Sequence, residues 1–153
     1  MSRIHTSIDV DVPVSTAYNQ WTQFEEFPRF MDGVERVVQR SDTTLEWTAE
    51  VGGRTKTWTA RITRQEPDRV IAWTAIDGAA NAGTVTFQPR VGGTRIELDL
   101  DVEPDGPMET AGDALGFVER RAKGDLERFK AFIESRGVET GAWRGTVDAG
   151  RTR

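Results

Sequence analysis

A few polar side chains could act as an acid or a base if they face the interior of the fold. Asp77 ends a predicted strand and continues an alternating series that contains Ile71 and Trp73. Burial among tryptophans favours the neutral form of a carboxyl group, which could then exchange a proton with a bound molecule. The other interpretation is that Asp77 caps the turn that starts at Gly78, a common role of aspartate before glycine.

Two further candidates depend on the regularity of their elements. Arg64 continues the inward series of Trp58 and Ile62 if its strand is regular, and it leaves that series if a bulge intervenes. Glu119 lies at the edge of the apolar stripe of a predicted C-terminal helix, where it faces either a pocket or solvent. Asp77, Arg64 and Glu119 are therefore the candidate catalytic residues, and whether any reaction is catalysed stays open.

Several other chemistries are not expected. The chain has no cysteine, which excludes disulfides, thiolate nucleophiles and cysteine-ligated metals. Its only histidine, His5, falls on the polar side of an alternating strand, so we expect neither a Ser-His-Asp triad nor a histidine metal site. The Gly-Gly-Arg-Thr-Lys segment at 52–56 lacks the spacing of a phosphate-binding loop and is interpreted as a hairpin turn. We expect no metal and no cofactor.

Length, composition and charge restrict the class of protein. A chain of 153 residues with 37% hydrophobic and 29% charged residues fits one soluble domain. The net charge of −5 gives no basic surface for nucleic acid. No apolar run approaches the roughly 18 residues that a membrane helix needs, and the N-terminus lacks the apolar core of a signal peptide. We expect a cytoplasmic protein without a transmembrane segment, and its oligomeric state stays open.

Alternation and turn residues predict a strand, two short helices and a meander. The first strand is predicted at 3–12, a helix from its N-cap Ser15 to about Phe24, and a second helical turn at 27–31. Six further strands are predicted at 34–41, 44–51, 55–65, 69–77, 83–90 and 94–103, with turn residues at each break. Because short turns join antiparallel neighbours, these six strands form a meander.

The predicted sheet has one apolar face, which a long helix covers. Trp47, Trp58 and Ile96 lie on the apolar face, so the sheet is covered on a single side. The cover is a helix at 108–136 with apolar residues at helical spacing: Ala111, Leu115, Val118, Ala122, Leu126, Phe129 and Ile133. Gly137 fits the position just past its end. Later residues show no period and are interpreted as a tail, loosely docked through Trp143.

The space between sheet and helix could hold a ligand. Trp47 and Trp58 face it, and Trp73 joins them if its strand alternates as the others do. Gly112 and Gly116 thin one flank of the covering helix, where each costs about 1 kcal/mol relative to alanine. Two alternatives stay open: the tryptophans fill a solid core, and the glycines lie at an exposed flank without a function.

Several short segments carry a resemblance to a known family. They are 12–14 together with Trp21, then Phe-Glu-Glu-Phe-Pro-Arg-Phe-Met at 24–31, and 71–73, 83–87, 93–95 and 126–130. In these segments and in element order, residues 3–136 resemble the SRPBCC or START-like superfamily, in its bacterial polyketide cyclase/dehydrase and coenzyme-Q-binding branch.

The resemblance implies a fold and a division of the chain. The fold would be α+β, a helix-grip fold in which a seven-stranded curved antiparallel sheet surrounds a long C-terminal helix. Two short helices would follow strand one, and strand one would pair with the last strand. Residues 1–137 would form the ligand-binding domain and residues 138–153 a C-terminal tail.

The resemblance also implies a class of function. Members bind lipids, quinones, hormones or polyketides in a deep cavity, so we expect binding or carriage of a small hydrophobic molecule. The alternative is a polyketide cyclase/aromatase or dehydrase. Such enzymes place an arginine, a tyrosine and a tryptophan in the pocket, whereas here the only tyrosine, Tyr18, lies on the first helix and Phe27 replaces the tryptophan. A third hypothesis is partner binding through an exposed turn at Phe27, Phe30 and Met31.

The predicted ligand-binding residues surround the space between sheet and helix, with a mouth near the second helical turn and the loop at 77–83. They are Phe27, Phe30, Met31, Trp47, Trp58, Trp73, Phe87, Leu98, Gly112, Leu115 and Gly116. We expect leucine at position 116 to fill part of this space.

Overall fold

The computed structural model describes residues 2–51, 53–78, 81–102 and 111–152, without the side chains of residues 2, 51 and 111–115. Short helices follow the first strand, and a long helix follows the meander. The elements are β1 (Ser2–Val10), α1 (Val14–Trp21), the 3-10 helix η1 (Phe24–Arg29), β2 (Val34–Gln39), β3 (Thr44–Val51), β4 (Arg54–Glu66), β5 (Val70–Gly78), β6 (Asn81–Arg90), β7 (Gly93–Val102), α2 (Ala111–Arg136), β8 (Val147–Asp148) and β9 (Arg151–Thr152).

The sheet is antiparallel at every pairing among the described strands. Its main path runs β1-β7-β6-β5-β4-β3-β2, and β1 pairs with β7 from Ser2 opposite Val102 to Val10 opposite Thr94. The predicted meander and the predicted pairing of the first strand with the last are therefore confirmed. The described sheet has nine strands rather than seven, because the C-terminal segment adds β8 and β9.

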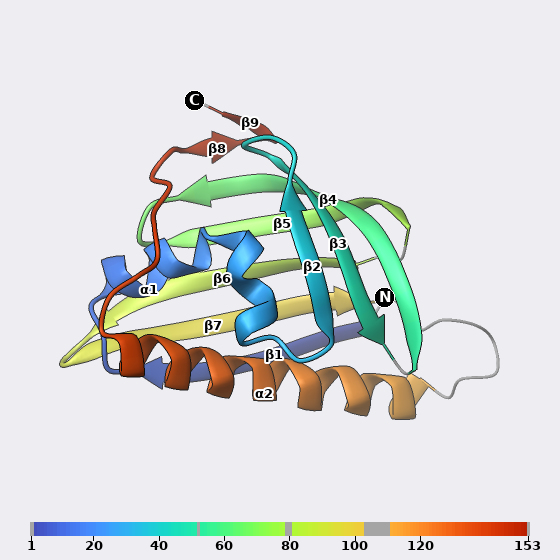
Figure 1. The fold of residues 1–153 in the computed structure, drawn as a ribbon, viewed down its shortest axis with the longest axis horizontal. Helices are drawn as coiled ribbons and strands as arrows, with labels where there is room; N and C mark the ends of the chain where they lie inside the picture. The colour runs from blue at the N-terminus through green and yellow to red at the C-terminus, as the bar shows by residue number, and fades with distance from the viewer. Residues whose placement is uncertain (1, 52, 79–80, 103–110, 153) are drawn as a thin grey trace.

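The covering helix lies as the sequence indicated. Figure 1 shows α2 running along the β1 side of the curved sheet, with α1 and η1 over the same face. The 26 residues of α2 give a length of about 39 Å at 1.5 Å per residue. Gly137 ends it with φ of +71° and donates its N–H to the Ile133 carbonyl at 2.8 Å, which confirms its position just past the helix end. The predicted start of this helix at 108–110 lies outside the described residues.

The first helix begins differently from the prediction. It starts at Val14 after Pro13, and no side chain caps it, so the assignment of Ser15 as the N-cap is wrong. Proline fixes the backbone before the first turn, and the Pro13 carbonyl accepts the Ala17 N–H at 3.1 Å. The second helical turn covers Phe24–Arg29 rather than 27–31.

A bulge in β4 decides which side chains face the interior. The register passes from Ile62 opposite Trp73 to Arg64 opposite Ala72, so one extra residue separates the two pairs. Beyond the bulge, Gln65 turns inward and is 1% exposed, while Arg64 lies on the outer face.

The C-terminal segment contacts both the core and the sheet, so its predicted docking through Trp143 is confirmed, while the expectation of loose docking is wrong. Val147 is 1% exposed and pairs with Gln65 of β4, and Trp143 packs against the core. The sequence did not predict the pairing of Val147 with Gln65, because the segment shows no helical or strand period and is held by hydrogen bonds to distant residues.

Candidate ligand-binding site

A cavity of about 260 Å³ lies between the sheet, the two short helices and α2. It is slightly smaller than the roughly 300 Å³ at the low end of sites for drug-sized ligands. Most of its wall is apolar, and the residues that line it are Trp21, Phe24, Phe27, Met31, Asp32, Val34, Leu45, Trp47, Ala49, Lys56, Trp58, Ile62, Ile71, Trp73, Asn81, Leu98, Leu100, Val102, Phe117, Val118, Arg121, Ala122, Asp125 and Leu126.

Aromatic rings form a continuous part of this wall. Trp47 of β3 lies opposite Trp58 of β4, and their rings stack with centroids 5.7 Å apart and planes 8° apart. Phe27 of η1 lies against Trp47 at 5.5 Å, and Trp21 of α1 meets Phe27 edge-on at 5.7 Å. Strand register places the stacked pair, because residues directly opposite in neighbouring strands share a face.

Trp73 reaches the cavity because a glycine lies opposite it. Trp73 of β5 pairs with Gly83 of β6, and a Cβ at position 83 would lie 2.4 Å from the Trp73 ring. The small residues predicted as a loop at 77–83 therefore belong largely to β5 and β6, with residues 79–80 outside the described part. The predicted seven-residue loop at the mouth is wrong, because β5 extends to Gly78 and β6 begins at Asn81.

The polar part of the wall was missed by the sequence analysis. Arg121 and Asp125 project from adjacent turns of α2, and Asp32 follows η1. The Asp125 carboxylate accepts the Asp32 backbone N–H at 2.9 Å and pairs with Arg128. Burial raises the pKa of Asp125 above its ordinary value, against the opposing effect of Arg128. A charged pair four residues apart beside an apolar stripe is a signal that could have identified these residues.

Arg121 links α2 to the end of β3. Its guanidinium donates to the Glu50 carbonyl and lies 4.8 Å from the centre of the Phe117 ring. A side chain at position 33 would collide with this guanidinium, and Gly33 has φ of +83°. The glycine therefore satisfies both a turn and the close approach of Arg121.

The three candidate catalytic residues lie away from the cavity wall. Asp77 is exposed and accepts the Thr59 backbone N–H at 2.8 Å. The Arg64 side chain is 54% exposed and pairs with Glu66 at 2.6 Å, and Glu119 is exposed on α2. The inward placement considered for Asp77 is thus wrong, because the pairing with β4 skips Ile76 between Ala75 and Asp77. For Arg64, the structure shows the alternative in which a bulge takes it out of the inward series.

The predicted ligand-binding residues divide into four groups. Six of them line the cavity: Phe27, Met31, Trp47, Trp58, Trp73 and Leu98. Phe30 and Phe87 lie in the core beside it, where Phe30 packs on Phe129 and Phe87 on Tyr18. Among the described residues, a Cβ at Gly116 would meet only the Arg120 guanidinium at 3.2 Å, and Gly116 is not one of the residues that line the cavity. For Gly112 and Leu115 the structure describes the backbone alone, so whether they border the cavity stays a prediction.

Two other sequence interpretations can be compared with the coordinates. Phe27 and Phe30 are each 2% exposed, so they do not form the exposed turn of the partner-binding hypothesis. His5 is on the outer face, as predicted, with its Nδ1 atom 2.7 Å from Asp99. Within the described ranges, no helix is long and apolar enough to cross a membrane, and no three acidic or histidine side chains gather as a metal site would need.

Comparison with known proteins agrees with this architecture. The sequence model of the family described as "Polyketide cyclase / dehydrase and lipid transport" matches residues 10–131. An uncharacterised 17.2 kDa protein of Streptomyces lincolnensis is 56% identical over 149 residues, which cover 96% of this chain and 99% of that protein.

Solved structures show the same fold at lower identity. The ZhuI aromatase/cyclase of Streptomyces sp. R1128 has a TM-score of 0.71 at 17% identity, over 93% of this chain and 99% of that chain. A START superfamily protein of Mycobacterium smegmatis has a TM-score of 0.67 at 17% identity, over 88% of this chain and 95% of that chain. With a family model that matches residues 10–131, a helix-grip architecture and an internal cavity, the chain belongs to the family described as polyketide cyclase/dehydrase and lipid transport.

Proposed function

We propose that the protein binds and carries a small hydrophobic molecule in the cavity between the sheet and α2. The observation that supports this most directly is the wall itself, in which aromatic and aliphatic side chains from the sheet, η1 and α2 surround about 260 Å³. Burial of apolar surface in such a space drives binding without specific polar contacts.

The shape of the wall favours a flat ligand over a flexible chain. The parallel rings of Trp47 and Trp58 and the edge-on contacts of Phe27 and Trp21 present several aromatic faces and edges. Aromatic ligands gain offset or edge-to-face contacts from such surfaces beyond the area that they bury. The preferred occupant is therefore a small, largely apolar ring system.

The binding proposal is tested by native mass spectrometry of freshly purified protein, followed by identification of the released molecule. We expect a population of protein that carries one small apolar molecule, which is lost on denaturation. A protein that is purified empty and then takes up no quinone, fatty acid or fused-ring compound would count against a carrier.

A second candidate function is cyclisation or dehydration of a bound polyketide. Asp125, with its raised pKa, and Arg121 lie in the cavity wall, so an acid or base and a cation border the apolar space. Asp125 could transfer a proton, and Arg121 could stabilise an enolate oxygen. The aromatase/cyclase among the structural neighbours shares only the fold with this chain and is no evidence for the reaction.

The cyclase candidate is tested with a linear poly-β-ketone thioester. An enzyme would accelerate its cyclisation above the spontaneous rate, and Asp125→Asn would remove that acceleration while still binding the substrate. A parent protein that binds the thioester without changing its rate or products would leave carriage as the function.

A further inference from the structure

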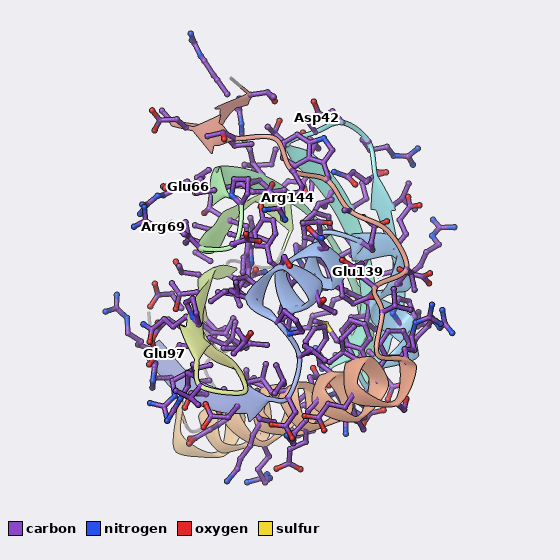
Figure 2. All side chains as sticks on the ribbon, turned by 90° about the vertical axis from the view of Figure 1, so that its left-hand side faces the viewer. Asp42, Glu66, Arg69, Glu97, Glu139 and Arg144 are labelled. Carbon is purple, nitrogen blue, oxygen red and sulfur yellow. The ribbon has the colours of Figure 1, made fainter. Side chains whose placement is uncertain are left out.

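Residues 138–148, here called the strap, pass along α1, and none of them is among the residues that line the cavity. The Asn19 side chain donates to the Glu139 carboxylate at 2.8 Å. Gln20 and Thr140 bond reciprocally, since the Gln20 amide donates to Thr140 Oγ1 at 3.1 Å and accepts the Thr140 backbone N–H at 2.9 Å. Figure 2 labels Glu139 on the segment that passes α1. The first half of the strap is therefore aligned with α1 by specific hydrogen bonds.

The second half of the strap continues this contact. The Trp143 backbone N–H donates to Thr22 Oγ1 at 3.1 Å. The Arg144 guanidinium donates to Asn19 Oδ1 at 2.6 Å and to Asp68 Oδ2 at 2.8 Å. Arg144, labelled in Figure 2, thus joins α1 to the turn between β4 and β5. A planar guanidinium suits such a two-partner contact better than any other cation.

The far end of the strap closes an open strand edge. β4 continues beyond its last pair with β3, which is Thr44 opposite Arg61, so residues 63–66 lack β3 on that side. Val147 pairs with Gln65 there, and the Gly150 N–H donates to the Thr63 carbonyl at 3.0 Å. Covering an unpaired edge satisfies its backbone groups and blocks pairing with another chain. The strap is thus anchored at both ends.

The strap is hydrogen-bonded to Gln20 and Thr22, the residues on either side of the cavity residue Trp21. Gln20 and Thr22 are 0% and 2% exposed and hold the strap, while Trp21 between them lines the cavity. The Trp21 ring meets the Phe129 ring of α2 at 5.0 Å. A shift of this helical turn would therefore move a wall of the cavity.

We propose that the strap is a positioning element for the cavity: by holding Gln20 and Thr22 it fixes Trp21, and so it sets how long a ligand stays bound. This inference rests on the proposed binding function. The strap lies beyond residues 10–131, the part that the family model matches, so it adds a control to the cavity that the matched core does not contain.

The experiment measures release of the uncharged dye N-phenyl-1-naphthylamine by stopped-flow fluorescence. Arg144→Met removes the link to Asn19 and Asp68, and we expect its dissociation rate constant to rise about three- to tenfold, as the loss of charged hydrogen bonds allows. Thr140→Val, which keeps shape but removes a hydroxyl, should act in the same direction and serves if the first variant does not fold. Arg151→Met, on exposed β9, is the charge-matched control and should release dye at the parental rate.

A second control separates positioning from stability. Val10→Ala removes packing from β1 at a buried position that neither lines the cavity nor lies opposite a residue that does, so it should lower stability without changing dye release. If strap variants release dye at the parental rate while hydrogen exchange shows the Thr140 and Trp143 amides unprotected, the inference is overturned. If the parent binds no dye, the proposed binding function fails. The strap inference is then tested by hydrogen exchange alone, and it requires that the backbone amides of residues 17–22 lose protection in the strap variants.

Discussion

Asp125 acquires its chemical character from its neighbours rather than from its residue type. It lies in a wall of aromatic and aliphatic side chains, where burial raises the pKa of its carboxyl group. The same residue type at Asp77 is exposed and bonds a backbone N–H. Sequence alternation pointed to Asp77 and not to Asp125, because it describes a single element and cannot tell which helix position meets the sheet.

The raised pKa of Asp125 predicts a pH dependence of stability. The folded protein holds this proton more tightly than the unfolded chain does, so Asp125 lowers the unfolding free energy as pH rises from 3.8 through the raised pKa. Asp125→Asn removes this loss. Urea denaturation of parent and variant across that range should show that the unfolding free energy of the parent falls relative to that of the variant as pH rises. A difference that stays constant, or that favours the parent at higher pH, would show that burial does not raise the pKa of Asp125.

Two residues of the α2 stripe test the core directly. Leu126 is 1% exposed and Phe129 is 0% exposed, in agreement with their predicted inward position. Either alanine substitution should lower the unfolding free energy by about 2–5 kcal/mol, because it removes transfer energy and leaves a void. Urea denaturation measures the loss, with Val91→Ala, at a fully exposed turn position, as the control expected near zero. A loss below about 1 kcal/mol for both residues would mean that α2 does not pack as described.

At the scale of elements, the sequence predicted which helices and strands exist, and in which order, better than it predicted where they begin and end. All six meander strands were found, because alternation and Gly-Gly or Pro-Asp turns are local signals. The bulge at 62–64 stayed an open alternative at the level of sequence, because it depends on how β4 meets β5, and it places Arg64 on the outer face and Gln65 on the inner one. The strap was missed for a related reason, since its contacts with α1 join residues more than 100 positions apart.

The surroundings of Gly83 in β6 and of Gly116 in α2 predict opposite effects of substitution by alanine. Gly83→Ala places a Cβ 2.4 Å from the Trp73 ring, so the ring or the strand must move, at a cost of about 1–3 kcal/mol. Gly116→Ala meets only a flexible arginine end and should stabilise α2 by up to about 1 kcal/mol. Denaturation midpoints measure both changes, and the tryptophan emission spectrum should shift only in Gly83→Ala. Equal stability of the two variants would show that Trp73 does not lie over Gly83.

At the scale of the whole molecule, the cavity exists because the long helix contacts the curved sheet along only part of its inner face. α2 runs along β1, while its contacts toward η1 and β3 include the side chains of Asp125, Arg128 and Arg121. The apolar series on both elements predicted that they face each other. Neither series could give the volume left between them or the polar residues at its border, because these depend on the sheet's curvature and on register.

Binding of an apolar dye to the parent and to two leucine variants of α2 tests the central claim most directly. Ala122 is 5% exposed and lines the cavity, so Ala122→Leu should fill it, whereas Gly116→Leu points toward Arg120 and serves as the matched control. The account predicts that N-phenyl-1-naphthylamine quenches tryptophan fluorescence of the parent and of Gly116→Leu with similar affinity. Ala122→Leu should bind at least about tenfold more weakly, or 1.4 kcal/mol, while remaining folded. A parent that shows no quenching, or a folded Ala122→Leu that binds as the parent does, would contradict a ligand cavity between the sheet and α2.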